Sequence, residues 1–327
     1  MAKTVIVTGG CGYIGSHVSR AFKQAGFAVY IVDTVFREHT VKDIDGYLID
    51  DFASDAVLSM IINYAPDIIV HCAGTSLVGP SMTDPAEYYH NNVTKTIKMM
   101  DVIKDMPKKP TIMFSSSASV YGIPKESPIR EQAPVSPISP YGSTKMIVEQ
   151  LLEDYGSAYG INTICFRYFN AAGAIETGDL GQEPNATHLV ARTIEASLNK
   201  RLLTINGEDF NTLDGTCVRD YVHVWDIALA HTKAAEFFAI HYGEDTVAGH
   251  HVFNLGGGRG TSNKEIVDCV YFTYGLTTVK YGPARPGDPD ILVADISTAR
   301  TVLGWNPVNS DIKNIIDTAY NWYNNRV

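Results

Sequence analysis

The fold is decided by the run Lys3-Thr4-Val5-Ile6-Val7-Thr8-Gly9-Gly10-Cys11-Gly12-Tyr13-Ile14-Gly15. Its first six residues are mostly apolar and β-branched, which predicts a buried parallel strand, and a helix-like segment follows from residue 16 to about 26. The glycines between them have G-x-x-G-x-x-G spacing: the first permits a tight turn, the second lets the backbone approach a pyrophosphate, and the third packs helix on strand. The helix N-terminus then offers its amides to phosphate oxygens. The residues predicted to contact a dinucleotide here are Gly9, Gly12, Tyr13, Ile14 and Gly15.

A second predicted strand, residues 28–32, ends at Asp33, 18 residues after Gly15. An acid at that position accepts hydrogen bonds from the hydroxyls of an adenosine ribose and repels a 2′-phosphate. The order of strand, glycines, helix, strand and acid therefore predicts NAD, rather than NADP, as the cofactor.

A tyrosine lies four residues before a lysine in the run Ser139-Pro140-Tyr141-Gly142-Ser143-Thr144-Lys145, which reads as the start of a helix. This spacing places the phenol and the ammonium group on one helix face. An unperturbed tyrosine has a pKa of about 10, and a cation beside it favours the phenolate. We therefore expect Lys145 to lower the pKa of Tyr141 until the phenol can act as a general base. The same pattern also occurs on solvated helices, so this prediction depends on the rest of the chain.

Composition excludes several classes of protein. The 327 residues are 45% apolar and 19% charged, which is typical of a globular protein with a large core. The formal net charge is −10 and no basic run is present, so we expect no nucleic-acid partner. Five cysteines without a C-x-x-C pair predict reduced thiols. No apolar run is long enough to span a membrane, and the early first strand leaves no room for a signal peptide, so we expect a cytoplasmic protein.

The first half of the chain alternates strand and helix. Further strands are predicted at 47–49, 67–72, 111–114 and 162–167, and helices at 53–64, 83–104 and from Tyr141 onward. This alternation predicts an α/β fold with a Rossmann-type doubly wound parallel sheet and a smaller C-terminal α/β substrate-binding domain. We expect the cofactor domain over residues 1–170 and the substrate domain over 171–327, with segments around 220–260 returning to the first.

The glycine loop, the serine run and the Tyr-x-x-x-Lys pair together resemble the extended short-chain dehydrogenase/reductase superfamily. Longer stretches are similar to the UDP-galactose 4-epimerases within it. These stretches are Thr8 to His17, Ser115-Ser116-Ser117-Ala118-Ser119-Val120-Tyr121-Gly122, Arg167-Tyr168-Phe169-Asn170, Asp214 to Val224, Asn254-Leu255-Gly256-Gly257-Gly258 and Arg285-Pro286-Gly287-Asp288. The resemblance runs over nearly the whole chain.

This resemblance implies a bound NAD and a UDP-sugar that is oxidised at C4, turned over as the 4-keto sugar, and reduced on its other face. Tyr141 would take the proton from the 4-hydroxyl, and Ser117 would hydrogen-bond the same oxygen. Lys145 would hold the nicotinamide ribose. Arg219 and Arg285 would pair with the diphosphate, because a guanidinium fork suits phosphate oxygens.

Other residues take roles only through the resemblance. Those implied at the cofactor are Asp51 and Phe52, which would flank the adenine, together with Cys72, Ala73, Gly74, Ser76, Asn91, Ser115 and Phe169. Those implied at the substrate, besides the residues above, are Asn170, His188, Leu189, Asn206, Asp288 and Leu292. No metal is implied. A homodimer is expected, with the helices near 87–106 and 141–159 pairing across a two-fold axis.

Three positions depart from the pattern of the family. Ser76 stands where members commonly have a lysine that reaches phosphates, and Asn206 stands where many have an aromatic ring stacked on uracil. Leu292 takes a wall position that is bulky in members restricted to plain hexoses, and its intermediate size predicts slower action on N-acetyl sugars.

Alternative functions remain open at this point. The chain could be a C4 epimerase of UDP-N-acetylglucosamine, UDP-glucuronate or a UDP-pentose. A 4,6-dehydratase would typically carry Thr-Asp-Glu where this chain has Ser117-Ala118-Ser119. A non-catalytic NAD-binding regulatory protein would need none of Ser117, Tyr141 and Lys145.

Overall fold

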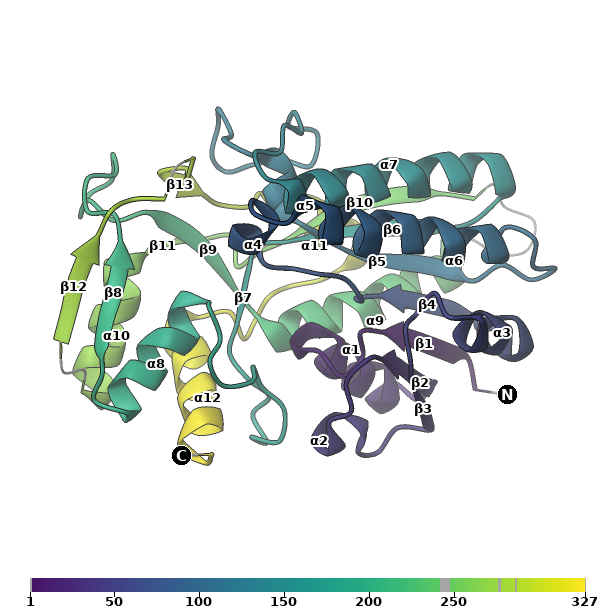
Figure 1. Ribbon diagram of the computed structural model, residues 1–327, viewed down its shortest axis with the longest axis horizontal. Helices are drawn as coiled ribbons and strands as arrows, with labels where there is room; N and C mark the ends of the chain where they lie inside the picture. The colour runs from purple at the N-terminus through teal and green to yellow at the C-terminus, as the bar shows by residue number, and fades with distance from the viewer. Residues whose placement is uncertain (1, 242–247, 276–277, 286, 327) are drawn as a thin grey trace.

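The computed structural model describes residues 2–241, 248–275, 278–285 and 287–326. Pro286, within the Arg285 to Asp288 motif, lies outside the described residues. In Figure 1 a parallel sheet runs across the right-hand part of the molecule, with helices above and below it, and a second lobe lies at the left.

The sheet has seven strands in the order β10-β6-β5-β4-β1-β2-β3, and every neighbouring pair is parallel. Strands β1 and β4 are buried on both faces, which explains why their sequences are mostly runs of apolar residues rather than alternating ones. The predicted α/β doubly wound fold is confirmed. The strands are β1 (Thr4–Thr8), β2 (Ala28–Asp33), β3 (Gly46–Ile49), β4 (Ile68–His71), β5 (Thr111–Ser117), β6 (Thr163–Tyr168) and β10 (His250–Leu255).

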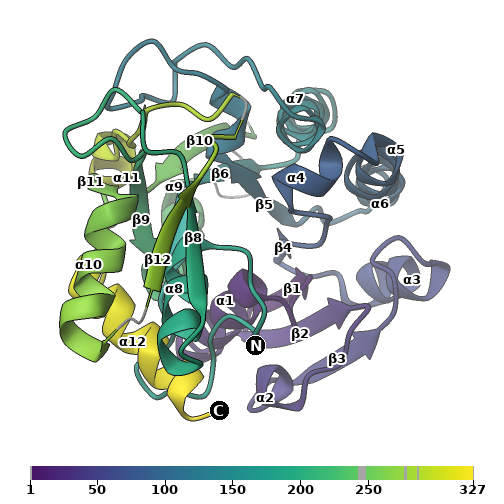
Figure 2. The same cartoon turned by 60° about the vertical axis from the view of Figure 1, so that its left-hand side comes forward.

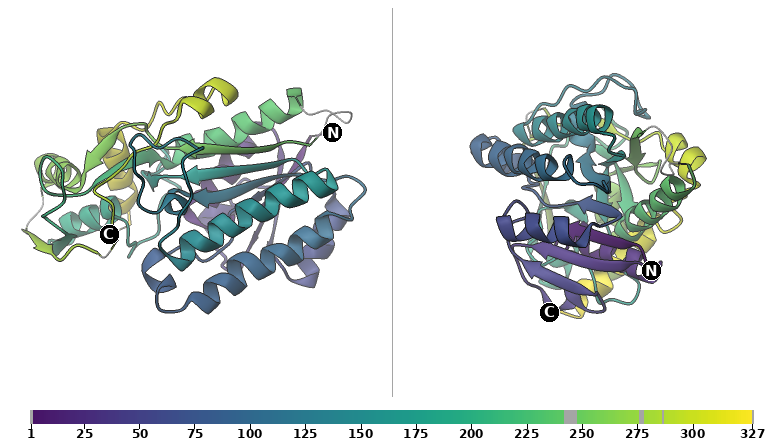
Figure 3. Two further views of the ribbon diagram at one scale, coloured as in Figure 1. Left: turned by 90° about the horizontal axis from the view of Figure 1, so that it is seen from above. Right: turned by 90° about the vertical axis from the view of Figure 1, so that its right-hand side faces the viewer.

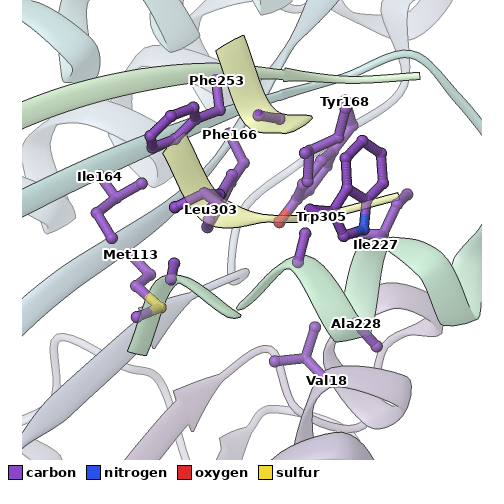
Figure 4. Close-up of a cluster of buried hydrophobic side chains, with 14 of the residues drawn as sticks. Val18, Met113, Ile164, Phe166, Tyr168, Ile227, Ala228, Phe253, Leu303 and Trp305 are labelled. Carbon is purple, nitrogen blue, oxygen red and sulfur yellow. The ribbon is translucent and has the colours of Figure 1, made fainter. Parts of the chain in front are cut away.

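Two hydrophobic cores cover the two faces of the sheet. Val5 and Val7 of β1 point into the core shared with α1 (Tyr13–Gln24) and α9 (Val224–His241), part of which is shown in Figure 4. Ile6 points the other way, into the core shared with α3 (Asp55–Tyr64), α6 (Lys95–Ile103) and α7 (Pro140–Tyr159). Figure 2 shows these two helical layers on opposite sides of the strands. Val5 and Val7 point to one face of the sheet and Ile6 to the other because successive side chains of a strand point to opposite faces.

The predicted helix at 83–104 is not continuous. It is built from α5 (Pro85–Tyr88), whose N-cap Asp84 accepts from the Glu87 amide, a π-helical turn at Tyr89–Thr94, and then α6. Such π-turns are frequent at functional sites because they redirect side chains. Two short helices, α2 (Glu38–Val41) and α4 (Val78–Ser81), follow β2 and β4, and a 3-10 turn, Ala118–Tyr121, follows β5.

The second lobe is formed after β6. Strand β9 (Val218–His223) pairs with β7 (Asn170–Ala172), β11 (Gly260–Ser262) and β13 (Ile291–Leu292), while β8 (Leu202–Asn206) pairs in parallel with β12 (Thr278–Gly282). Helices α8 (Leu189–Leu198), α10 (Asn263–Tyr274) and α12 (Ile312–Asn324) surround a core around Trp322, and α11 (Ser297–Leu303) packs by α9. Among the described residues, no helix combines the length and apolarity needed to cross a membrane.

Candidate active site

The three predicted catalytic residues meet at the carboxyl edge of the sheet. Ser117 is the last residue of β5, and Tyr141 and Lys145 lie on the first turns of α7, which runs along that strand. The helix starts here because Ser139 caps it through the Gly142 amide and proline occupies its first position. The Ser117 hydroxyl group donates to the Ser119 hydroxyl group and accepts from the Ser119 amide, both at 3.1 Å, and it lies close enough to the Tyr141 phenol to act against the effect of burial on the pKa of that phenol.

Lys145 is almost fully buried beside this pair. Its Nζ donates to the Ser115 carbonyl at 2.8 Å and lies 5.8 Å from the centre of the Tyr141 ring and 4.7 Å from that of Phe114. Burial lowers the pKa of Lys145 to about 8. The expected lowering of the Tyr141 pKa is wrong for this structure: burial raises the pKa of Tyr141, and the hydrogen bond from Ser117 opposes that only in part. Both groups lose hydration, which disfavours phenolate and ammonium alike.

Removing the buried charge is expected to stabilise the fold. The pKa of Lys145 falls from 10.5 to about 8 on folding. Below pH 8 the side chain is charged in both the folded and the unfolded protein, so folding bears the full free-energy cost of burying the charge. Above pH 10.5 the side chain is neutral in both, and this cost disappears. We expect Lys145→Met to raise the free energy of unfolding by up to about 3 kcal/mol at pH 7, and by much less at pH 10. Urea unfolding of both proteins at the two pH values measures this, with exposed Lys125→Met as the control. A less stable Lys145→Met protein at pH 7 contradicts the prediction.

The glycine turn has the geometry that a dinucleotide needs. Gly9 has φ +69°, and a Cβ there would lie 2.6 Å from the Ala73 amide nitrogen; one on Gly15 would lie 2.2 Å from the Gly9 carbonyl oxygen. Gly12 caps α1 with no side chain, so the first amides of this helix remain open to an anion. These residues fit a pyrophosphate. Tyr13 and Ile14 can contact a pyrophosphate only through their backbone amides. Their side chains are engaged elsewhere: the Tyr13 hydroxyl donates to the Gly173 carbonyl at 2.6 Å, and Ile14 packs on the core.

Asp33 stands at the end of β2, next to this turn. Its carboxylate accepts from the Cys11 amide at 2.9 Å and from the Val35 amide at 3.0 Å, which holds it toward the place where an adenosine ribose would lie. Arg37 donates to the Cys11 carbonyl at 2.8 Å. Sequence reasoning missed this arginine because nothing in its local pattern links residue 37 to the glycine turn.

The adenine end of the site carries a lysine that sequence reasoning also missed. Asp51 follows β3, and Lys95 Nζ donates to its Oδ2 at 2.5 Å and to Asn91 Oδ1 at 2.9 Å. Burial raises the pKa of Asp51, but the hydrogen bond from Lys95 is the largest of the effects that lower it. Together these lowering effects leave the pKa of Asp51 below its usual value. Phe52 is buried, with its ring edge-on to His71 at 4.8 Å, so its side chain belongs to the core.

The loop after β4 is held by an asparagine outside the predicted set. Asn92, buried in the π-helical turn, accepts from the Thr75 amide at 2.8 Å and donates to the Thr75 carbonyl and to Thr144 Oγ1. Asn91 donates to Thr75 Oγ1 at 2.9 Å. In the sequence, only the position of Asn92 next to the predicted site residue Asn91 indicated that it could contribute to the site. Gly74 approaches Asn92 closely, since a Cβ there would lie 2.8 Å from its Oδ1, and Ser76 is exposed.

Ser115 connects the site to a buried polar chain. Its hydroxyl group donates to Cys72 Sγ at 3.0 Å and lies 3.0 Å from the Tyr168 hydroxyl, which in turn lies 2.9 Å from His231 Nε2. Phe169, predicted beside the nicotinamide, is 6% exposed and packs with the core.

The predicted substrate residues fall into two groups in the second lobe. Asn170, His188 and Leu189 line one pocket with Tyr221, and Gln182 lies 2.5 Å from His188 Nδ1. The second group comprises Arg219, Asp288, Leu292, Asn206 and Arg285. Leu292 sits opposite Arg219 in the β13–β9 pairing, Asp288 lies 3.7 Å from Arg219 Nη2, and Asn206 contacts Arg285. Within the described ranges, no three His, Cys, Asp or Glu side chains are grouped as a metal site.

Fold and site together define a nucleotide-dependent α/β enzyme of the short-chain dehydrogenase/reductase type, with its Ser–Tyr–Lys group at the carboxyl edge of a parallel sheet. The model of the NAD dependent epimerase/dehydratase family matches residues 5–256. The chain belongs to this family.

Similar proteins match this chain over nearly its whole length and nearly the whole of theirs. The chain is 38% identical to the UDP-glucose 4-epimerase of Halalkalibacterium halodurans, over 98% of this chain and 95% of that one. It superposes on the UDP-glucose 4-epimerase of Brucella ovis in complex with NAD with a TM-score of 0.91, 39% identity and 98% coverage of both chains. A UDP-Glc/GlcNAc 4-epimerase from Campylobacter jejuni is also similar, with a TM-score of 0.84, 32% identity and coverage of 99% of this chain and 100% of that one.

Proposed function

We propose that this chain is an NAD-dependent epimerase that interconverts UDP-glucose and UDP-galactose by inverting C4. The observation that carries the proposal is the grouping of Ser117 and Tyr141 with Lys145, whose Nζ lies 5.8 Å from the centre of the Tyr141 ring, at the same sheet edge as the glycine turn and Asp33. The names of the relatives support the same reaction. NAD, when bound at the glycine turn and Asp33, would supply the reversible hydride acceptor that such a reaction needs.

The roles of the side chains follow from their placement. Tyr141 takes the proton of the sugar 4-hydroxyl and returns it after the 4-keto sugar has turned over, and Ser117, next to the phenol, hydrogen-bonds the same sugar oxygen and helps to pass the proton. Lys145, whose Nζ lies 5.8 Å from the centre of the Tyr141 ring, holds the nicotinamide ribose and provides a positive charge beside the phenol. Arg219 and Arg285 hold the diphosphate, so binding energy anchors the nucleotide without fixing which face of the sugar is presented.

We also propose a division into two lobes. Residues 1–170, together with α9 and β10, form the NAD-binding lobe, and the remaining segments form the UDP-sugar lobe. Strand β10 supports this division because it pairs with β6 at the end of the seven-stranded sheet. A cytoplasmic location is also proposed; all five cysteines are free thiols, as a reducing compartment would keep them.

The test is anion-exchange chromatography of the protein incubated, without added NAD, with each of four sugars: UDP-galactose, UDP-N-acetylgalactosamine, UDP-glucuronate and a UDP-pentose. We expect UDP-galactose to yield UDP-glucose, which also requires a retained cofactor. From the size of Leu292 we expect slower conversion of the N-acetyl sugar. Conversion of only one of the other sugars would reassign the substrate, and no conversion of any, with NAD added, would refute an epimerase.

A homodimer built on α6 and α7 is proposed as well. These helices lie side by side on the outer face, as Figure 3 shows, and they carry the exposed apolar residues Ile97 (37%) and Tyr159 (43%). Light scattering at micromolar concentration is expected to give twice the mass of the 35.8 kDa chain. Ile97→Glu should shift it toward monomer, whereas Leu202→Glu, at an exposed site on β8, should not. A monomeric parent protein contradicts the proposal.

A further inference from the structure

Asn206 and Arg285 meet at one end of the β8–β12 pair. Asn206 is the last residue of β8 and lies opposite Gly282, the last residue of β12, and the Gly207 amide donates to the Gly282 carbonyl at 2.9 Å. Arg285 follows three residues later. The side-chain amide of Asn206 faces this guanidinium group, and because arginine offers only donors, we assign the amide oxygen to the near position, where it accepts from Arg285 Nε at 3.0 Å and from Nη2 at 3.1 Å. One edge of an otherwise exposed guanidinium group is therefore held by a single neutral acceptor.

The second arginine of this lobe is held in a similar way. Arg219 Nη1 donates to the carbonyls of Val218 at 2.9 Å and Pro289 at 2.8 Å, whereas the Asp288 carboxylate is 3.7 Å from Nη2. Neutral oxygens thus make the closest contacts with both guanidinium groups. A carboxylate at such short range would neutralise much of the positive charge, whereas an amide or carbonyl oxygen orients the group and leaves that charge available.

We propose that Asn206 is a positioning residue for Arg285, which it presents to the diphosphate of the nucleotide, rather than a contact to the base. The inference rests on the proposed function, which places a nucleoside diphosphate in this lobe. A free arginine side chain must lose much rotamer freedom to grip phosphate. The hydrogen bonds from Nε and Nη2 remove part of that cost in advance, and they leave Nη1 of this exposed residue for phosphate oxygens.

The experiment compares binding of UDP and of uridine, measured by calorimetry on the NAD-loaded protein, for the parent, Asn206→Ala, Asn206→Asp, Arg285→Met and the double variant Asn206→Ala/Arg285→Met. We expect Asn206→Ala to weaken UDP binding about tenfold, as for the loss of a hydrogen bond to a charged group, and to leave uridine binding unchanged. Asn206→Asp should weaken UDP binding more, because its carboxylate neutralises Arg285. In the Arg285→Met background, Asn206→Ala should have no further effect.

Turnover supplies a second readout. Because the diphosphate contact is the same in the ground state and in the transition state, Asn206→Ala should raise KM for UDP-galactose and leave kcat near that of the parent. Equal losses for uridine and UDP, or a loss that persists in the Arg285→Met background, would overturn the inference and assign Asn206 to the base. Either result leaves the epimerase proposal intact, which fails only if the parent protein converts no UDP-sugar. A parent protein that binds no UDP overturns this inference alone.

Discussion

Tyr141→Phe is expected to fold, retain NAD and lose about 10²–10⁴-fold in kcat. The substitution removes the hydroxyl group beside Ser117 and keeps the ring of a residue that is 9% exposed and lies edge-on to Tyr88 at 6.4 Å. Packing is therefore preserved while the proton acceptor is lost. The measurement is the initial rate of UDP-galactose conversion, together with the NAD content of the purified variant and its urea midpoint.

Tyr88→Phe is the matched control. The Tyr88 hydroxyl donates to the Leu77 carbonyl at 2.5 Å, so this variant loses a buried phenol in the same cluster without losing one beside Ser117. We expect its kcat to remain close to that of the parent. If Tyr141→Phe also kept most of its activity, or if both variants lost activity equally, Tyr141 would not be the base.

Glu149→Ala is expected to destabilise the protein by about 3–5 kcal/mol, which is a large part of the stability of a typical domain. Glu149 lies one turn beyond Lys145 on α7 and is paired with Arg167 of β6, whose Nε and Nη2 donate to it at 3.0 and 2.6 Å. Both side chains are less than a tenth exposed. Removing the carboxylate leaves the guanidinium charge buried, with only the Tyr121 hydroxyl and the Glu131 carbonyl as acceptors.

Urea unfolding at pH 7 and constant NAD concentration measures this effect, since a bound ligand shifts the midpoint. The double variant Glu149→Met/Arg167→Met removes both charges and should recover most of the lost stability. Lys264→Ala breaks an exposed pair with Asp268 (side chains 45% and 43% exposed) and should cost less than about 1 kcal/mol. A Glu149→Ala variant no less stable than Lys264→Ala would show that the buried pair does not support the catalytic helix.

Much of the cofactor half of the site could be predicted from sequence because its signals are local. The first strand, the glycine turn and Asp33 lie within 31 residues, counted from Lys3. Tyr141 and Lys145 share a helix, and their spacing alone places them on one face. The prediction failed for the helix at 83–104, whose course depends on contacts with another segment. It is interrupted by a π-helical turn, from which Asn91 and Asn92 hydrogen-bond to Thr75 in the loop after β4. The spacing of apolar residues in the sequence does not indicate this turn.

The sequence by itself determined the α/β class, and it predicted the glycine turn with Asp33 and the Tyr141–Lys145 pair, because each depends on residues close together in the chain; the role of Ser117 came only from the resemblance to the family. Only the tertiary structure decided which distant groups meet: Asn206 with Arg285, Glu149 with Arg167, and Asp51 with Lys95. It also decided the direction of the Tyr141 pKa shift. The physical reason is that every element packed around an ionisable group removes part of the water that hydrates it. The electrostatic cost of burial is therefore a property of the assembled fold and not of any one segment.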